Sequence, residues 1–136
     1  MSSVPNYRAL AEFRHQIRCF LVFSEQAARG VGLEAQQHQL LLAVKGLPEA
    51  QRPTIRAISN RLQLRHHSVV ELVDRLAARR LVKRKRSTVD GREILIEITP
   101  SGDRLLRRLS EAHRAELNRS MPSLVSALDA IVETHS

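Results

Sequence analysis

The hydrophobic period of the chain changes from helical to strand-like near residue 82, and this change constrains the fold more than any other feature. Over 69–76 apolar residues recur at intervals of three and four, which places them on one face of a helix. Over 93–98 isoleucines occupy every second position, which places them on one face of a strand. The helix stripe consists of Val69, Leu72, Val73 and Leu76, and the strand face of Ile94, Ile96 and Ile98. The chain therefore has to pack helices against a short strand.

Apolar spacing predicts four helices upstream of this change. The first spans 7–29 and the second 34–45, and glycines follow both. Thr54 can cap a short third helix, and a turn at 63–65 leads into the fourth helix, which carries the stripe. Two short helices that meet at a tight turn, the second with a polar outer face, are typical of a helix-turn-helix.

Downstream, the sequence predicts a hairpin and a helical C-terminal region. A basic run at 83–86, a turn at 89–92 and the strand at 93–98 form a hairpin with a cationic tip, which is typical of a wing. Thr99-Pro100 is typical of the cap and first residue of a long helix. We expect Met121-Pro122 to end this helix before a last one. The side chains expected to face inward on the long helix are Leu105, Leu106, Leu109 and Ala112.

Composition favours a core made mainly of helices. Aromatic residues make up 3% of the chain and Trp is absent, so Leu, Ile, Val and Ala have to fill the core. We expect a single, mainly α domain over 1–136 with a small β-wing. Its winged helix-turn-helix lobe spans 33–99, and the helical regions 1–31 and 100–136 lie outside this lobe.

Positive charge is concentrated in the middle of the chain. Residues 52–92 contain twelve Lys and Arg against three acidic side chains, a net charge of +9, whereas the remainder has ten against eleven, a net charge of −1. One surface is therefore expected to face a polyanion such as nucleic acid. A basic surface that only keeps the protein in solution is the alternative.

Further features narrow the location and the chemistry. The N-terminus has no secretory signal and no stretch approaches the ~20 apolar residues that cross a bilayer, so we expect a cytoplasmic protein without a membrane partner. Because Cys19 is the single cysteine, one chain can form neither an intrachain disulfide nor a cysteine-based zinc cage. The sequence has no glycine-rich phosphate loop, metal-ligand motif or paired nucleophile, so we expect neither an enzyme nor a cofactor.

Four segments, in this order, resemble the MarR family of bacterial transcriptional regulators, and the likeness covers nearly the whole chain. They are Leu62–Leu76, similar to the family's recognition helix; Leu81–Arg84; Asp90-Gly91-Arg92, in place of the Asp-x-Arg wing signature; and Ile98–Gly102, similar to Leu-Thr-x-x-Gly. The resemblance implies a homodimer on a pseudo-palindromic operator in double-stranded DNA, with the N- and C-terminal helices forming a two-fold dimerisation region. It also implies a repressor that a small-molecule effector or an oxidative signal releases.

The resemblance places the fourth helix in the major groove and the wing in the adjacent minor groove, where Arg92 would insert. Arg84, Lys85 and Arg86 can each release a counterion from the phosphates, which gives affinity without sequence preference. Asp90 cannot favour phosphate, so it belongs to the turn or holds an arginine in position. The residues expected to reach base edges or the flanking backbone are Arg65, His66, His67, Ser68, Val70, Glu71 and Arg75.

Two positions depart from the family's pattern. Arg80 stands where the family usually has a glycine at the end of the recognition helix. We expect the left-handed cap that a glycine offers there to be either lost or strained, at roughly 1 kcal/mol, and Arg80 to add a phosphate contact instead. Glu34 stands where the family often has a hydroxyl cap, which affects only the start of the second helix.

Cys19 has two readings. Its segment is similar to the reactive-cysteine segment of the family's organic-hydroperoxide sensors, which would make it a redox switch. Those sensors hold the thiolate with tyrosines, whereas this chain has only Tyr7. A buried structural thiol is therefore the favoured reading.

The histidines predict no metal site. His66 and His67 diverge by about 100° around a helix and cannot easily chelate one ion. The others are scattered along the chain, without the spacing of a ligand set; they are His15, His38, His113 and His135. Glu71 and Arg75 are i, i+4 neighbours, for which a surface ion pair is the plain alternative to base contact.

Two other functions stay open at this point. The chain could be a protein-interaction module that keeps the winged fold without reading DNA, but the basic wing argues against this. It could also be an RNA-binding basic domain. The basic segment lacks aromatic residues on which RNA bases stack, which argues against that reading.

Overall fold

The computed structural model describes residues 4–132 of the chain. This part contains, in order, α1 (Tyr7–Gly30), α2 (Ala35–Lys45), α3 (Ile55–Leu62), α4 (His66–Ala78), β1 (Val82–Arg86), β2 (Ile94–Ile98) and α5 (Pro100–Ile131). The predicted fold class, mainly α with a small β-wing in a winged helix-turn-helix, is confirmed. The two ends of the predicted domain, and with them His135, lie outside the described residues.

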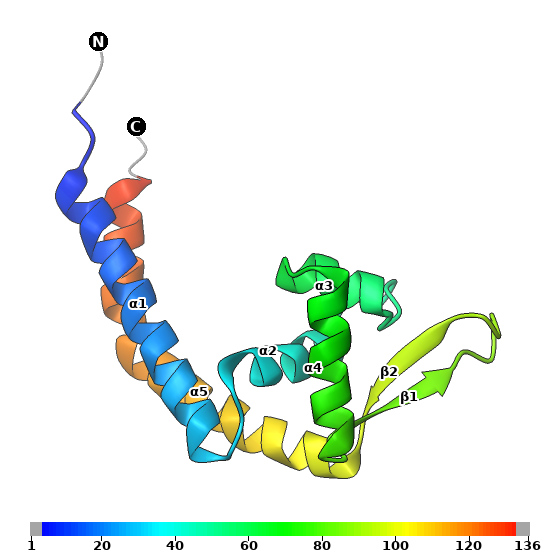
Figure 1. The fold of residues 1–136 in the computed structure, drawn as a ribbon. Helices are drawn as coiled ribbons and strands as arrows, with labels where there is room; N and C mark the ends of the chain where they lie inside the picture. The colour runs from blue at the N-terminus through cyan, green and yellow to red at the C-terminus, as the bar shows by residue number, and fades with distance from the viewer. Residues whose placement is uncertain (1–3, 133–136) are drawn as a thin grey trace.

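The elements form an arm and a lobe (Figure 1). In the arm, α1 packs along the C-terminal part of α5; the lobe consists of α2, α3, α4 and the hairpin. α5 begins beneath the lobe and then continues into the arm, so a single helix belongs to both parts. Any movement of the lobe relative to the arm therefore has to be accommodated along α5.

The core lies inside the lobe and extends onto the first turns of α5. The predicted stripe of α4 is confirmed, since Val69, Leu72, Val73 and Leu76 are all buried. The same cluster contains Leu40 and Leu41 of α2, Ile58 of α3, Ile96 of β2, and Leu106 and Leu109 of α5. Ala112, however, is exposed, so its predicted inward orientation is wrong: the next residue, His113, faces the neighbouring helices instead.

The hairpin is antiparallel and pairs Val82 with Ile98 at its base and Arg86 with Ile94 near its tip. The loop before α3 runs beside it, because the N–H of Ile96 donates to the carbonyl of Pro53 at 2.8 Å. This contact holds the wing against the helix-turn-helix.

Helix starts follow the predicted caps. The N–H of Ala57 donates to Thr54 Oγ1 at 3.1 Å at the start of α3. α2 begins after Glu34, whose N–H donates to Gln37 Oε1 at 2.9 Å, so a side-chain amide supports the start where a hydroxyl cap is missing.

The end of α4, the start of β1 and the first turn of α5 meet at one backbone junction, which we call the Thr99 junction. Arg80 has a φ of 60°, so of the two expected outcomes, a lost cap and a strained left-handed one, the structure has the second. Its carbonyl accepts a hydrogen bond from Thr99 Oγ1 at 2.6 Å, and the carbonyl of Leu81 accepts one from the N–H of Thr99 at 3.1 Å. Gly102 lies against Leu81 so closely that a Cβ would be 2.1 Å from the Leu81 oxygen.

α5 is a single helix, so the predicted interruption at Met121-Pro122 is wrong. Proline removes one donor N–H and crowds the carbonyl four residues earlier. Neither effect ends the helix here, because tertiary packing holds it before and after the proline. Here the helix beyond Pro122 packs on α1: Ala127 of α5 and Ala9 of α1 are both buried. Tertiary packing thus outweighs the local preference.

Two histidines that are far apart in the sequence come together where α1, α2 and α5 meet. The ring centroids of His38 in α2 and His113 in α5 are 4.9 Å apart. His113 Nε2 lies 2.8 Å from Ser24 Oγ in α1, and its Nδ1 lies 2.6 Å from the carbonyl of Leu109. α1 also presents two phenylalanine rings edge-on to His113. Two residues that are scattered along the sequence therefore meet in the fold.

His38 belongs in the folded protein as a neutral ring. It is 4% exposed, and its Nδ1 is buried without a hydrogen-bond partner among the described residues. Burial lowers the pKa of His38, and the neighbouring His113 lowers it further. A proton placed on His38 would therefore be destabilising.

Because of His38, the stability of the protein is expected to decrease as the pH is lowered. The ordinary pKa of His is 6.5, and the folded value lies below it, so the unfolded chain takes up this proton first as the pH falls. The free energy of unfolding should therefore decrease as the pH falls below about 6.5. Urea unfolding at pH 7.5 and at pH 5 should show a smaller decrease for His38→Leu than for the wild type. The control His67→Gln changes an exposed ring of α4; an equal decrease in all three proteins would contradict the assignment to His38.

Gly102→Ala should destabilise the protein by about 1–3 kcal/mol, because the new methyl group would overlap the Leu81 carbonyl and force the Thr99 junction apart. Gly30→Ala is the matched control: nothing lies within 4 Å of the added Cβ, and alanine favours the end of α1. Thermal unfolding followed by circular dichroism measures both variants. Equal melting temperatures for the two would show that the close approach does not constrain the fold.

Candidate nucleic-acid interface

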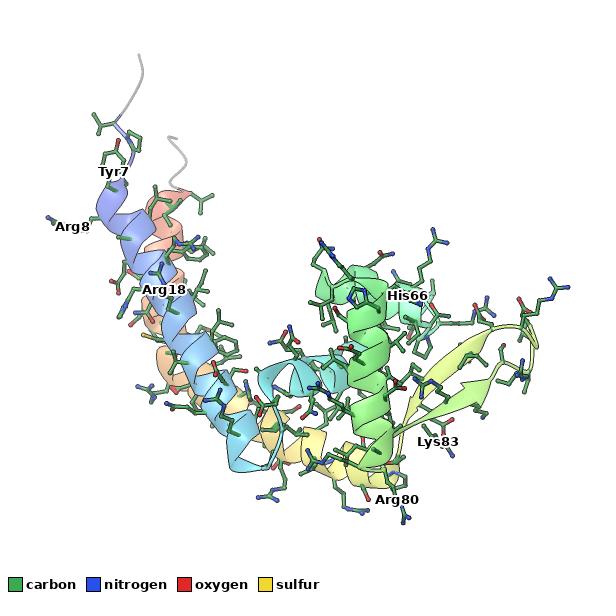
Figure 2. All side chains as sticks on the ribbon, in the orientation of Figure 1. Tyr7, Arg8, Arg18, His66, Arg80 and Lys83 are labelled. Atoms are coloured by element: carbon green, nitrogen blue, oxygen red, sulfur yellow. The ribbon has the colours of Figure 1, made fainter. Side chains whose placement is uncertain are left out.

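α4 presents an open N-terminal end and a polar face to solvent (Figure 2). His66 lies at the end of α4 next to α3, whereas Arg80 and Lys83 lie near the base of the hairpin, at the other end. The N-cap residue, Arg65, has an extended backbone and places no side-chain cap on the first turn. The first N–H groups of α4 thus have no side-chain cap from Arg65 and lie at the positive end of the helix dipole, which attracts phosphate.

The seven predicted recognition residues run from Arg65, just before α4, to Arg75 in its last turn, and they differ in exposure. Exposed side chains belong to Arg65, His66, His67, Glu71 and Arg75. Half-buried side chains belong to Ser68 and Val70. Within residues 4–132 no ion pair joins Glu71 and Arg75, so the surface ion pair that was the alternative to base contact is not found. Both side chains are available for other contacts.

The tip of the wing is a loop closed by its own hydrogen bonds. Ser87 Oγ accepts from the N–H groups of Val89 and Asp90, each at 3.2 Å. Asp90 Oδ1 accepts from the N–H of Arg92 at 3.0 Å, so Asp90 does belong to the turn. The Arg86 guanidinium donates to the carbonyl of Gly91. The loop therefore has a defined shape before any ligand binds.

Several cations of the wing already have partners inside the chain. Arg84 pairs with Asp74 of α4 at 2.5 Å, and Lys83 and Lys85 approach Glu97 of β2 at 3.7 and 3.8 Å. Such exposed pairs are each worth only about 0–1 kcal/mol, so phosphate can replace the carboxylate. The Arg84 pair nevertheless links the wing to α4.

Arg92 differs from these cations. Its side chain has no ion pair or hydrogen bond to another residue of the described chain, and the residue is exposed at the end of the tip loop. Its backbone is held by Asp90 while its guanidinium is free. Arg92 is thus the wing arginine that can enter a groove without first breaking an internal contact.

Other contacts beside the interface were not predicted. Arg52, in the loop before α3, pairs with Glu93 beside β2 at 2.9 Å. Neither this pair nor the Asp74–Arg84 pair has a local sequence signal, because each joins elements that meet only in the folded lobe. Arg80 lies at the far end of α4 from His66. The phosphate contact expected of Arg80 stays a prediction.

Cys19 is exposed on α1, so the expectation of a buried structural thiol is wrong. Its Sγ lies 3.5 Å from Nε2 of His15, one helical turn earlier. Its redox activity stays untested.

The described residues show neither a metal cluster nor a membrane-spanning helix. Within residues 4–132, no three side chains of His, Cys, Asp or Glu come together as they would around a metal ion. No helix in the same part of the chain combines the length and the apolar character that a membrane crossing needs.

Solved structures with the same architecture come from several bacteria. AbsC, a MarR family transcriptional regulator from Streptomyces coelicolor, is 17% identical, with a TM-score of 0.72 over 98% of this chain and 94% of that one. CouR from Rhodococcus jostii, bound to p-coumaroyl-CoA, is 24% identical, with a TM-score of 0.66 over 87% of both chains. A mutant of MepR from Staphylococcus aureus, bound to an oligodeoxyribonucleotide, is 23% identical, with a TM-score of 0.64 over 89% of this chain and 83% of that one.

Comparison of the sequence with known proteins and with protein families gave one match, to a family. A search of curated protein sequences found no match. Residues 31–93, which contain α2, α3, α4 and most of the hairpin, match the model of the MarR family. This match assigns the winged helix lobe to the MarR family of transcriptional regulators, and the remaining helices share the fold of the solved structures.

Proposed function

We propose that this protein is a homodimeric repressor that binds a pseudo-palindromic operator in double-stranded DNA and is released by a signal. The observation that carries the proposal is that the uncapped, polar end of α4 and the unpaired Arg92 of the wing belong to one lobe, whose wing and α4 are linked by Arg84 and Asp74. The cytoplasmic location stays a prediction. It agrees with the proposal, because an operator requires a location where chromosomal DNA is present. A repressor of this kind acts by occupying DNA and needs no catalysis or cofactor.

In this proposal α4 enters the major groove with its N-terminal end first. Arginine can pair with guanine, and His and Ser can donate to or accept from base edges. The half-buried Val70 offers an apolar surface to a thymine methyl group. The proposed recognition residues remain Arg65, His66, His67, Ser68, Val70, Glu71 and Arg75.

The wing supplies the second contact, in the adjacent minor groove. A narrow minor groove concentrates negative potential, which favours the single free guanidinium of Arg92. Arg84, Lys85 and Arg86 lie along β1 and would meet the flanking phosphates after exchanging their internal partners. Asp90 contributes by holding the backbone of Arg92.

Binding to duplex DNA should depend steeply on salt. If about six phosphates are contacted, affinity should fall by roughly 10³ or more between 50 and 200 mM salt. Fluorescence anisotropy with labelled duplex DNA and with an RNA of the same sequence measures this. A flat salt response would contradict DNA binding, and a preference for the RNA would favour the RNA-binding alternative.

Arg92→Ala should weaken duplex binding without unfolding the protein, because the side chain has no partner inside the described chain. A loss of about 1–3 kcal/mol is expected for one groove contact. The matched control is Arg108→Ala, which removes an exposed arginine of α5 and should leave affinity nearly unchanged. Unchanged affinity in Arg92→Ala would show that the minor-groove role is wrong.

The proposed dimerisation region is made from 1–31 and 100–136, which include the arm, and the lobe at 33–99 is a separate functional part of the same domain. The large exposed apolar side chains of α1 and α5 lie at Leu10, Ile17, Leu21, Val22, Met121, Val125 and Leu128. Monomeric proteins rarely leave so many apolar side chains exposed along one part of the structure. A second copy of the arm, related by two-fold symmetry, would bury them.

Val125→Glu should convert the dimer to a monomer, since it would place an unpaired charge in the interface. Val89→Glu is the matched control, because Val89 is even more exposed but lies at the tip of the wing. Sedimentation velocity at micromolar concentration should give a monomer for the first variant and a dimer for the second. A wild-type protein that sediments as a monomer would contradict the proposed dimer itself.

A cavity of about 350 Å³ between α2 and α5 supports release by a small-molecule effector. Its walls include Leu42, Leu117 and Met121, and His38 and His113 line it as well. This volume lies within the range of small-molecule sites. An occupant would touch both the lobe and α5, and could release the operator by favouring a spacing of the two α4 helices that does not fit the half-sites.

A further inference from the structure

The tip of the wing exposes a threonine whose hydroxyl supports no other part of the fold. Thr88 is exposed, and within residues 4–132 its hydroxyl forms no hydrogen bond. The neighbouring Ser87 is 7% exposed, and its Oγ accepts hydrogen bonds from two N–H groups of the tip loop. The hydroxyls of Thr54 and Thr99 cap helices. Thr88 therefore carries a hydroxyl that can react without breaking a contact of the fold.

The residues around Thr88 form a pattern that basophilic protein kinases, which prefer cationic substrates, recognise. Acidic side chains in the cleft of such a kinase pair with Arg or Lys two and three residues before the hydroxyl, and many of these kinases accept an apolar side chain directly after it. Arg86 and Lys85 occupy the two basic positions, and both are exposed. Val89 follows Thr88 and is 85% exposed, so the lobe itself does not use this apolar side chain.

The same basic pattern occurs a second time in the chain, and the structure separates the two copies. Arg107 and Arg108 lie three and two residues before Ser110. Ser110, however, lies inside α5, and the residue before it, Leu109, is 2% exposed in the core. A kinase has to align the acceptor hydroxyl with the γ-phosphate of ATP, so the acceptor segment has to enter the kinase cleft. α5 would have to unfold around Leu109 to present Ser110 in this way.

The tip loop is accessible where the middle of α5 is not. It lies at the outer end of the hairpin, away from the arm (Figure 1). β1, which leads into it, is exposed from Lys83 to Arg86. β1 pairs with β2 in a two-stranded sheet, so in the described part of the chain its other edge is open to a partner. A kinase can thus reach Thr88 and the basic residues before it in the folded protein.

A cationic hollow beside Thr88 would receive a phosphate. It has a volume of about 270 Å³ and lies between the wing and the loop before α3. Thr88 lines it together with Arg52, Lys85 and Arg86. Arg52 and Lys85 are paired with carboxylates, whereas the Arg86 guanidinium donates to the uncharged carbonyl of Gly91. A phosphate on Thr88 would compete for Arg86, because a charged acceptor binds a guanidinium more strongly than a carbonyl does.

We propose that Thr88 is a phosphorylation site for a basophilic Ser/Thr protein kinase, and that its phosphate releases the wing from DNA. In this reaction Thr88 Oγ1 forms a bond to the γ-phosphorus of ATP, the bond from that phosphorus to the bridging oxygen breaks to give ADP, and the hydroxyl proton passes to the catalytic aspartate of the kinase. The product adds a charge of about −1.5 to −2 beside the cations of β1, and this charge repels the DNA backbone. The release rests on the DNA-binding function proposed above, whereas the acceptor role of Thr88 does not.

The first test measures phosphate transfer to the folded, full-length protein without DNA. The protein is incubated with a purified basophilic kinase of the cyclic-AMP-dependent type and radiolabelled Mg·ATP, and mass spectrometry locates the phosphate. The wild type and Ser110→Ala should be labelled equally, and Thr88→Ala should lose the label. Both replaced side chains are exposed, so the variants should fold, and thermal unfolding verifies this. An unlabelled wild type, a label on Ser110 or undiminished labelling of Thr88→Ala would overturn the acceptor assignment.

The second test measures the affinity of the kinase-treated proteins for labelled duplex DNA by fluorescence anisotropy. The phosphorylated wild type should bind about 10-fold or more weakly than wild type treated with kinase but without ATP, because the added charge opposes the cations of the wing. Kinase-treated Thr88→Ala should keep the affinity of the untreated variant. Unchanged affinity after phosphorylation of Thr88 would overturn the proposed release. A wild type that is phosphorylated at Thr88 but never binds duplex DNA would instead contradict the proposed function, and the acceptor assignment would stand.

Discussion

The contact between Gly102 and the Leu81 carbonyl is the constraint on which the rest of the architecture depends. It brings three elements of different roles to one point: α4, the first strand of the wing, and the helix that continues into the arm. Thr99 adds two hydrogen bonds at this junction, from its hydroxyl to the carbonyl of Arg80 and from its N–H to the carbonyl of Leu81. Because these contacts involve the backbone itself and one short side chain, they set the direction in which α5 leaves the lobe. Side-chain packing then holds that direction.

Local patterns predicted the parts of the lobe whose residues lie close together in the sequence. The stripe of α4, the caps at Thr54 and Thr99, and the wing strands all follow from spacing or from a residue beside its own partner. At Arg80, where the family usually has a glycine, the resemblance left a lost cap and a strained left-handed cap open, and the structure has the strained one. The same resemblance proposed seven recognition residues, from Arg65 before α4 to Arg75 in its last turn, and their contact with DNA stays to be measured.

The failures have a common physical origin. Pro122 lies inside α5 because packing on α1 supports the helix beyond it, and no window of sequence contains that information. The pairing of His38 with His113, and of Asp74 with Arg84, joins residues that only the tertiary fold brings together. Cys19 was expected to be buried because free cysteines often are, but burial on a helix depends on which side faces a neighbour. Charge counting has the same weakness, since several cations of the wing are balanced within the lobe.

The closed tip of the wing has a consequence for how groove and protein adapt to each other. A loop tied by Ser87, Asp90 and Arg86 has already lost most of its conformational freedom, so it gives up little entropy on association. The same ties leave it little room to bend. In the proposed complex, a groove whose width does not match the hairpin would require the duplex to deform instead, and the stiffness of the DNA would then become a source of discrimination at base pairs that no side chain touches.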